Sequence, residues 1–356
     1  MLYGKWNWNA LSTLTPIRDI DKYSYLPWIM EEIQFNLSIT VDYIRNHNYK
    51  WNLDIISSNI NLSEIESHPD IEWDRDYLSS NKSITVSDIL RLKLPNATSE
   101  WNWDWIMEEI ATIEDVRRYP ELPWTKNGLS NITGMTVSDM ELLANKPGTW
   151  NMYSLSTIVP VSDMLQHIDM GWDREYISMN STLTIESMSK FDVPTVTGEW
   201  TWSLIGEHIN MDEIRSHPNL EWNKSDISLN SGITIDDISI LSNIKGKWNW
   251  KRLSAFFNIA DIRSHPNLDW NYAGLSKNKT LDMNYILEHP SEHWDWGSIS
   301  TNIPVLNVYL YPSYPWSREG LSDNRDLRIT DLISWREVSI PSYYNMMKWK
   351  KNVVIV

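Results

Sequence analysis

The stretch from Trp200 to Ile238 decides the fold; it reads WTWSLIGEHINMDEIRSHPNLEWNKSDISLNSGITIDDI. Within it, Trp200 and Trp222 are each followed five residues later by isoleucine, at Ile205 and Ile227. The same Trp-to-Ile/Leu spacing recurs every 22 to 28 residues, at 14 anchors: Trp6, Trp28, Trp51, Trp73, Trp101, Trp124, Trp150, Trp172, Trp200, Trp222, Trp248, Trp270, Trp294 and Trp316. Self-similarity at a nearly constant period is typical of a repeat architecture.

Two kinds of repeat alternate along the chain, and we number the repeats 1 to 14 by their anchors. Odd repeats begin W-N-W-x-x-[LI] in their clearest copies, Trp248–Leu253 and Trp294–Ile299 (with Asp for Asn), and end in His or Tyr followed by Pro. Even repeats read W-x-x-x-x-[LI]-S-x-N-x-x-[IL]-T-[IV], with Asn eight residues after the anchor in six of seven copies and Ile132 in the other. The true period is therefore the pair, 45 to 50 residues long.

Each repeat is predicted to hold two short helices. The first begins at or just after the anchor Trp, and the Ser-x-Asn stretch ends it, because Asn tolerates the left-handed conformation and bonds its local backbone. The second opens at Thr in even repeats, as in Thr85–Asp88 and Thr234–Asp237, which have the spacing of a capping box. Proline ends the second helix of odd repeats, because it pushes the preceding residue out of the helical region.

Helices this short are not stable alone, so each pair must bury its apolar face against neighbouring pairs. The sequence therefore predicts an all-α, right-handed-type helical solenoid of about 14 two-helix units of 22–28 residues, paired into about seven super-repeats. A leucine-rich repeat is rejected, because its strand needs an apolar residue three positions after the anchor, where Asp76, Asp104 and Lys251 stand. Residues 1–334 form the predicted solenoid, and residues 335–356 form an atypical C-terminal cap or docking tail.

Composition excludes several classes of function. The 356 residues include 31 Lys and Arg against 47 Asp and Glu, a net charge of −16, which argues against nucleic acid as a partner. No cysteine is present, so thiolate metal sites and cysteine nucleophiles are excluded. No apolar run reaches the roughly 18 residues of a membrane helix, so no membrane partner is expected.

The reactive side chains follow the repeat and do not gather into a site. His68, His217 and His265 share one slot at a helix end, where histidine also suits the helix dipole. Carboxylates occupy capping positions or solvated pairs such as Glu108 and Glu109, and no phosphate-binding or nucleophile-elbow motif occurs. We expect no enzyme activity, no catalytic, cofactor-binding or metal-binding residues, and no cofactor.

Trp accounts for 22 residues, against only 4 Phe. The anchors are interpreted as large fillers between repeats. The second Trp of W-x-W has two readings, a further structural filler or part of an aromatic stripe that stacks on a sugar or a peptide. These second tryptophans, with four residues of the variable slots after the anchors, are the partner-binding candidates: Trp8, Trp103, Trp202, Trp250, Trp296, Arg75, Tyr77, Lys126 and Lys224.

Insertions recur at the end of even repeats, at Leu92–Glu100, Phe191–Glu199 and Leu241–Lys247. Because they return at every second repeat, they are expected to line one edge of the solenoid. One reading makes them tolerated loops, and the other makes them a surface for binding.

The repeated residues resemble a known family. W-N-W, the S-x-N-x-x-I-T of Asn81–Thr85 and Asn230–Thr234, and the connectors Leu122–Trp124 and Leu26–Trp28 resemble the tryptophan-rich repeat proteins of large double-stranded DNA viruses of amoebae and other protists. The resemblance covers roughly residues 5–335, although the family's Asn-Pro is missing from every copy. It implies a viral protein in the host cytoplasm or the virion, and it carries over no activity and no site residues.

Three functions follow as hypotheses. The first is a non-enzymatic repeat scaffold that binds an unknown host or viral protein through a solenoid face or its insertion-bearing edge. The second is a structural component of a virus particle. The third is carbohydrate binding, which requires the second Trp residues to form an exposed row.

Overall fold

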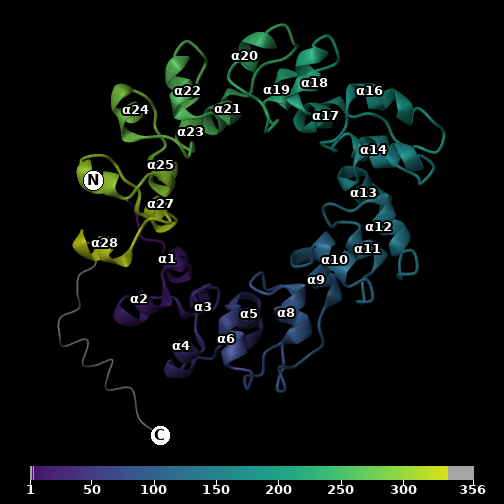
Figure 1. Cartoon of the computed structure of the whole chain (residues 1–356). Coiled ribbons are helices and arrows are strands. Elements are labelled where there is room, and N and C mark those ends of the chain that lie inside the picture. Colours follow the sequence, from purple (N-terminus) through teal and green to yellow (C-terminus); the bar gives the residue numbers. More distant parts are fainter. Residues whose placement is uncertain (1, 3, 336–356) are drawn as a thin grey trace. The chain divides into compact units, whose positions relative to one another are not determined.

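The computed structural model describes residue 2 and residues 4–335, and this part of the chain is all-helical (Figure 1). It contains 28 α-helices, two short 3-10 helices and no strand, only three isolated β-bridges. Two α-helices follow each of the 14 anchors, which confirms the predicted all-α class and the two-helix repeat. Apart from Trp335, the predicted cap or docking tail at 335–356 lies outside the described residues.

The first helix of each repeat begins two residues after its anchor. The first helices are α1 (Trp8–Leu14), α3 (Met30–Ile33), α5 (Leu53–Asn59), α7 (Arg75–Leu78), α9 (Trp103–Glu109), α11 (Lys126–Leu129), α13 (Met152–Ile158), α15 (Arg174–Ile177), α17 (Trp202–His208), α19 (Lys224–Ile227), α21 (Trp250–Phe256), α23 (Tyr272–Leu275), α25 (Trp296–Asn302) and α27 (Arg318–Ser322).

The second helices complete the repeats. They are α2 (Ile17–Lys22), α4 (Val41–Asn46), α6 (Leu62–Ser67), α8 (Val86–Arg91), α10 (Ile113–Arg118), α12 (Val137–Leu142), α14 (Val161–Met164), α16 (Ile185–Met188), α18 (Met211–Ser216), α20 (Asp237–Ile240), α22 (Ile259–Ser264), α24 (Met283–Glu288), α26 (Leu306–Leu310) and α28 (Ile329–Ser334). The 3-10 helices extend α14 and α16, at Leu165–His167 and Ser189–Phe191.

The chain divides into two compact units. Unit 1 comprises Met1–Ser83, Leu92–Ser99 and Asp282–Val356, and unit 2 comprises Ile84–Arg91 and Glu100–Leu281. Both ends of the chain thus belong to unit 1.

The anchors of even repeats explain why His or Tyr precedes them by five residues. The indole N–H of each of these seven Trp residues donates to the carbonyl of that residue, as in Trp73 to His68 (2.9 Å) and Trp124 to Tyr119 (2.8 Å). The acceptor is the last residue or the C-cap of the preceding helix, whose carbonyls have no partner inside the helix. The connector between the helix and the Trp is therefore fixed at both ends.

The Asn of even repeats ties each first helix to the first helix of the repeat before it. Buried Asn180 donates from its amide nitrogen to the carbonyls of Ser156 (3.0 Å) and Val159 (2.7 Å), and its oxygen accepts the N–H of Thr182. The predicted local bonding is confirmed, but the predicted left-handed conformation is wrong: the non-glycine residue with positive φ in the described chain is Ser99. The helix ends because Asn captures the neighbour's free carbonyls.

Replacing Asn180 by Leu should lower the free energy of unfolding by about 2–4 kcal/mol, because two buried carbonyls lose their partner. Urea denaturation followed by circular dichroism measures this loss. The exposed Asn219, changed to Leu, is the matched control and should alter stability by less than about 0.5 kcal/mol. Equal losses in the two variants would contradict the structural role of Asn180.

An aspartate at the start of a second helix is linked to an arginine of the preceding repeat. In α20, Asp237 accepts the backbone N–H of Thr234 (2.8 Å), and Arg215 of α18 donates to both carboxylate oxygens of Asp237 (2.7 and 2.8 Å). Arg117 of α10 holds Asp139 of α12 in the same way, at 2.8 Å for both bonds. Asp139 therefore completes the capping box of α12 and also receives a guanidinium from the preceding repeat. The predicted capping box at Thr234–Asp237 is wrong: α20 begins at Asp237, and its N-cap, Asp236, makes no side-chain cap bond.

Changing Asp237 to Asn should cost about 1–2 kcal/mol at about pH 7, and this cost should shrink as the pH falls below about 3.8. Burial acts to raise the pKa of Asp237, but the hydrogen bonds from Arg215 and Thr234 outweigh it and leave the pKa below the ordinary 3.8. A lowered pKa contributes stability above about pH 3.8 that is lost as the pH falls through the folded-state value. Urea denaturation of both proteins from about pH 7 to about pH 2.5 checks the expectation, and a difference in stability that does not narrow at the acid end would contradict it.

The first and last repeats are joined within unit 1 by the contacts that join consecutive repeats. Helix α1 lies beside α27 (Figure 1), and the backbone N–H of Asn7 donates to Ser322 Oγ at 3.0 Å. Between consecutive repeats, Asn151 donates to Ser130 Oγ at 2.9 Å in the same way. Ser322 of repeat 14 therefore accepts from repeat 1 the same hydrogen bond that Ser130 accepts from the repeat that follows it in the sequence.

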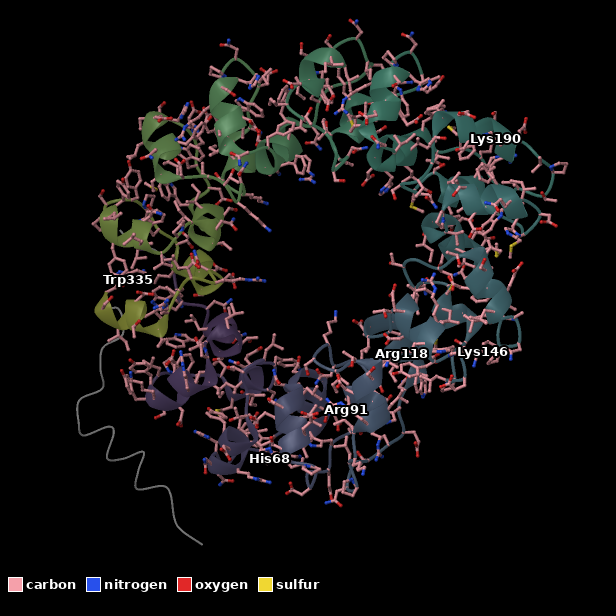
Figure 2. The ribbon with its side chains drawn as sticks, in the orientation of Figure 1. His68, Arg91, Arg118, Lys146, Lys190 and Trp335 are labelled. Carbon is pink, nitrogen blue, oxygen red and sulfur yellow. The ribbon has the colours of Figure 1, made fainter. Side chains whose placement is uncertain are left out.

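Two further contacts complete this terminal junction. The Arg318 guanidinium donates to the carbonyls of Leu2 (3.0 Å) and Gly4 (3.2 Å), as that of Arg174 does to Val196 and Gly198. Gly4 and Gly198 each stand two residues before an anchor Trp and share positive φ, +78° and +70°. An apolar cluster of Leu11, Leu26, Ile329 and Leu332 fills the junction, and Trp335 (labelled in Figure 2) stacks on Trp6 with ring centroids 6.2 Å apart.

Candidate functional site

The second Trp of W-x-W packs between repeats. Trp296, for example, lies edge-on to the next anchor, Trp316, with ring centroids 5.0 Å apart at 90°. The same contact, at 5.1 to 5.4 Å, is made by the other four pairs: Trp8–Trp28, Trp103–Trp124, Trp202–Trp222 and Trp250–Trp270. Edge-to-face pairs of this kind contribute about 0.5–1.5 kcal/mol beyond burial.

No Trp is exposed within residue 2 and residues 4–335. Five even anchors are fully buried, and the second Trp residues of W-x-W are half-buried. The described part of the chain therefore lacks the row of exposed indoles that carbohydrate binding requires.

Two candidate residues in the variable slots hydrogen-bond the insertions at the ends of their own repeats. The Arg75 guanidinium donates to the carbonyls of Leu94 (2.8 Å), Ala97 (3.2 Å) and Ser99 (3.2 Å). Lys224 Nζ donates to the Ser242 carbonyl at 2.7 Å and lies 5.9 Å from the Trp248 ring centroid. These side chains have partners inside the chain, and a direct role for them in partner binding stays a prediction.

Lys126 and Tyr77 are half-buried in the first helices α11 and α7. The backbone N–H of Lys126 donates to the Pro147 carbonyl at 2.9 Å, so Lys126 also contacts the segment that follows the second helix of its repeat. Arg75, Lys126 and Lys224 each contact the segment at the end of their own repeat, so these candidates do not form one shared site.

The insertions are packed segments of the fold. Leu94 and Phe191 are buried, and Thr98 forms a two-bond bridge, donating its N–H to the Trp73 carbonyl (2.8 Å) and accepting from the Arg75 N–H (3.1 Å). Each insertion thus covers the start of the first helix in its own repeat.

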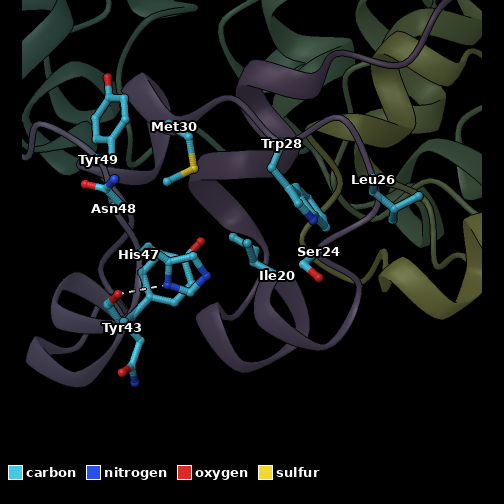
Figure 3. A pocket seen from close by; sticks show the side chains of 10 residues that line it. Ile20, Ser24, Leu26, Trp28, Met30, Tyr43, His47, Asn48 and Tyr49 are labelled. Atoms are coloured by element: carbon cyan, nitrogen blue, oxygen red, sulfur yellow. Dashed lines mark hydrogen bonds between the residues drawn. The ribbon is translucent and has the colours of Figure 1, made fainter. Parts of the chain in front are cut away.

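Repeat 2 has no insertion, and a cavity of about 500 Å³ opens there in unit 1. Its walls come from the connector after α2, the start of α3 and the end of α4. Figure 3 shows its main lining residues: Ile20, Leu26, Trp28, Met30, Tyr43 and Tyr49. A volume of this size, with apolar and aromatic walls and a few polar groups, is typical of a ligand site.

A polar pair forms one wall of the cavity. The His47 ring stacks on Tyr43 with centroids 3.9 Å apart, and its Nδ1 lies 2.9 Å from the Tyr43 carbonyl oxygen (Figure 3). Its Nε2 faces Asp21 at 3.5 Å. Burial, assisted by the charge of Asp21, raises the pKa of Tyr43 to about 12, so the phenol stays a neutral hydrogen-bond donor at physiological pH.

This cavity was not predicted from the sequence, although the sequence contains a signal for it. Trp28 and Trp51 are 23 residues apart, whereas the even repeats that carry insertions are followed by the next anchor after 26 or 28 residues. The shorter spacing marks an even repeat that lacks a covering segment, as does the 24-residue spacing from Trp270 to Trp294.

Within the described residues, no three His, Asp or Glu side chains gather where they could hold one metal ion. No helix of the described chain is both long and apolar enough to cross a membrane. No family model, no curated protein and no solved structure matches the chain. The resemblance to viral tryptophan-rich repeat proteins stays a prediction from the repeated residues.

Proposed function

We propose that the repeats stack as an α-solenoid that serves as a non-enzymatic scaffold and binds another protein along its insertion-bearing edge. The main support is an exposed aliphatic side chain that recurs near the end of the second helix in even repeats. It lies close in sequence to the buried residue at which the insertion begins. In unit 2 these residues are Leu90, Leu142 and Ile240, which are 48%, 57% and 58% exposed. Leu142 and Ile240 directly precede the buried residues Leu143 and Leu241.

The chemistry of this edge favours a protein partner. Recurring exposed aliphatic residues offer area whose burial contributes roughly 25 cal/mol per Å², and they lack the flat faces on which sugars stack. The repeated Trp, Asn and Ser residues are occupied in joining repeats, so the residues that differ between repeats are available for recognition.

Mutation of this edge tests the proposal. The affinity-tagged full chain is used to capture proteins from a lysate of its source or host cells, and the near-stoichiometric partner is identified by mass spectrometry. The triple variant Leu90→Lys, Leu142→Lys, Ile240→Lys should lose that partner by more than tenfold while its circular dichroism and melting temperature stay unchanged.

A matched triple variant controls for a general effect of added charge. It places lysine at three exposed leucines away from these helix ends: Leu14, Leu37 and Leu306. This control should keep the partner. Retention by the first triple variant, or the absence of any near-stoichiometric protein on the wild type, would refute the proposal. Capture of virion coat proteins would identify the partner as a particle component.

A further inference from the structure

We propose that the cavity of repeat 2 binds an extended peptide segment of a partner protein, one that carries a Leu or Phe side chain preceded by a basic residue. The inference rests on the proposed protein-binding function and adds the site and the chemistry of the ligand. Its basis is that the chain's own insertions fill the equivalent place in repeats 4, 6, 8 and 10.

Side-chain contacts establish this equivalence. Insertions bond the carbonyls of the preceding connector at positions two, three and four before the even anchor. The bonds are Lys146 Nζ to Leu122 O (2.7 Å), Asn96 Nδ2 to Asp70 O (2.8 Å) and Thr195 Oγ1 to Ile168 O (3.2 Å). In the connector before Trp28, the positions two and four residues earlier are Leu26 and Ser24, and both line the cavity.

The backbone of repeat 2 offers the same bridge that the insertions use. Thr197 donates to the Trp172 carbonyl (3.0 Å) and accepts from the Arg174 N–H (2.8 Å), as Thr98 does in repeat 4. The corresponding groups are the Trp28 carbonyl and the Met30 N–H, which have no hydrogen-bond partner within residue 2 and residues 4–335. An extended peptide can pair with both groups.

The cavity also suits the side chains that the insertions bury. Leu94 and Phe191 are buried in their joints, and each follows a lysine, Lys93 or Lys190. Ile20, Trp28 and Tyr43 provide an apolar and aromatic wall for such a residue.

Two acidic side chains lie beside the cavity. Asp21 Oδ1 is 3.5 Å from His47 Nε2, and Glu31 follows Met30 at the start of α3. A lysine or arginine that precedes the apolar residue of the peptide meets this acidic side, which fits the basic residue in the proposed ligand.

Repeat 2 lacks the arginine that other even repeats place on the covering segment. Where repeats 4, 8 and 14 place Arg75, Arg174 and Arg318 on backbone carbonyls, repeat 2 has Met30. Met30→Arg should therefore supply the missing donors to a bound peptide and strengthen its binding.

The test titrates full-length protein into a fluorescein-labelled, C-terminally amidated peptide of residues 92–99, and follows fluorescence anisotropy. We expect saturable binding, tightened by about tenfold in Met30→Arg and weakened by more than tenfold in Ser24→Trp, which fills the rim of the cavity. The matched control Ser216→Trp changes an exposed serine beside another connector and should bind like the wild type. In the peptide, Leu94→Asp, or an N-methyl group at Thr98, should abolish binding, the latter because it removes the donor to Trp28.

The outcomes separate this inference from the proposed function. No binding at millimolar protein, or equal binding to the wild type and Ser24→Trp, would overturn the peptide site. If the partner captured from lysate is also kept by Ser24→Trp, the edge proposal stands and the cavity proposal fails. Loss of that partner from Ser24→Trp, together with the peptide results, would place its recognition segment in the cavity.

Discussion

Replacing Leu332 with Asp in the last repeat is expected to release the first repeat, more than 300 residues earlier in the sequence. Leu332 is 0% exposed and packs with Leu11 and Leu26 of repeat 1 in the terminal junction. A carboxylate there should cost about 3–5 kcal/mol of local stability, because a charged group replaces the buried isobutyl side chain of leucine. Hydrogen exchange should show protection of the amides in α1 and α2 falling by more than about 100-fold.

Leu310→Asp is the matched control for this experiment. Leu310 lies in α26 of the neighbouring repeat and is 61% exposed, so the same charge should leave the exchange of α1 and α2 unchanged. Unchanged exchange in Leu332→Asp itself would show that the terminal junction does not hold the first repeat.

The second large effect is expected for Trp172→Ala. Trp172 is fully buried, and its indole N–H donates to the His167 carbonyl at 2.8 Å. Removal leaves a large cavity and takes one of two donors from the His167 carbonyl, which keeps only the Met170 N–H at 3.3 Å. This loss should lower the free energy of unfolding by about 3–5 kcal/mol in urea denaturation.

Two companion variants divide this cost into its parts. Trp172→Phe keeps much of the volume and loses the N–H donor, so its loss should be about 1–2 kcal/mol. The exposed Tyr153, changed to Ala, should cost less than about 1 kcal/mol. A loss in Trp172→Ala no larger than that in Tyr153→Ala would contradict the role of the even anchors.

Repeat number, helix number and class could be predicted because they depend on local patterns. The Trp anchor with Ile or Leu five residues later, Thr at the helix start and His-Pro at the helix end all act within one repeat. The helix starts at Trp103 and Lys224 follow from such signals, because N-caps and apolar spacing are short-range features.

Interactions between repeats could not be predicted in the same way. The pattern around Asn180 and Trp296 shows that each recurs, but the partner lies about 20 residues away, and the sequence alone does not say which atoms meet. The cavity of repeat 2 is harder still, because it follows from a missing segment. The contact of Asn7 with Ser322 has no sequence signal beyond the fact that both belong to standard repeats.

The terminal junction also constrains how such a gene can change. In a repeat array with free ends, recombination can add or delete a pair of repeats, because an end repeat has only one neighbour to satisfy. Here the contacts of Arg318 and Ser322 reach residues 2–7, so an added pair must also restore that match between the two ends. We therefore expect unequal crossing-over that changes the copy number to give proteins in which Arg318 and Ser322 lose these contacts.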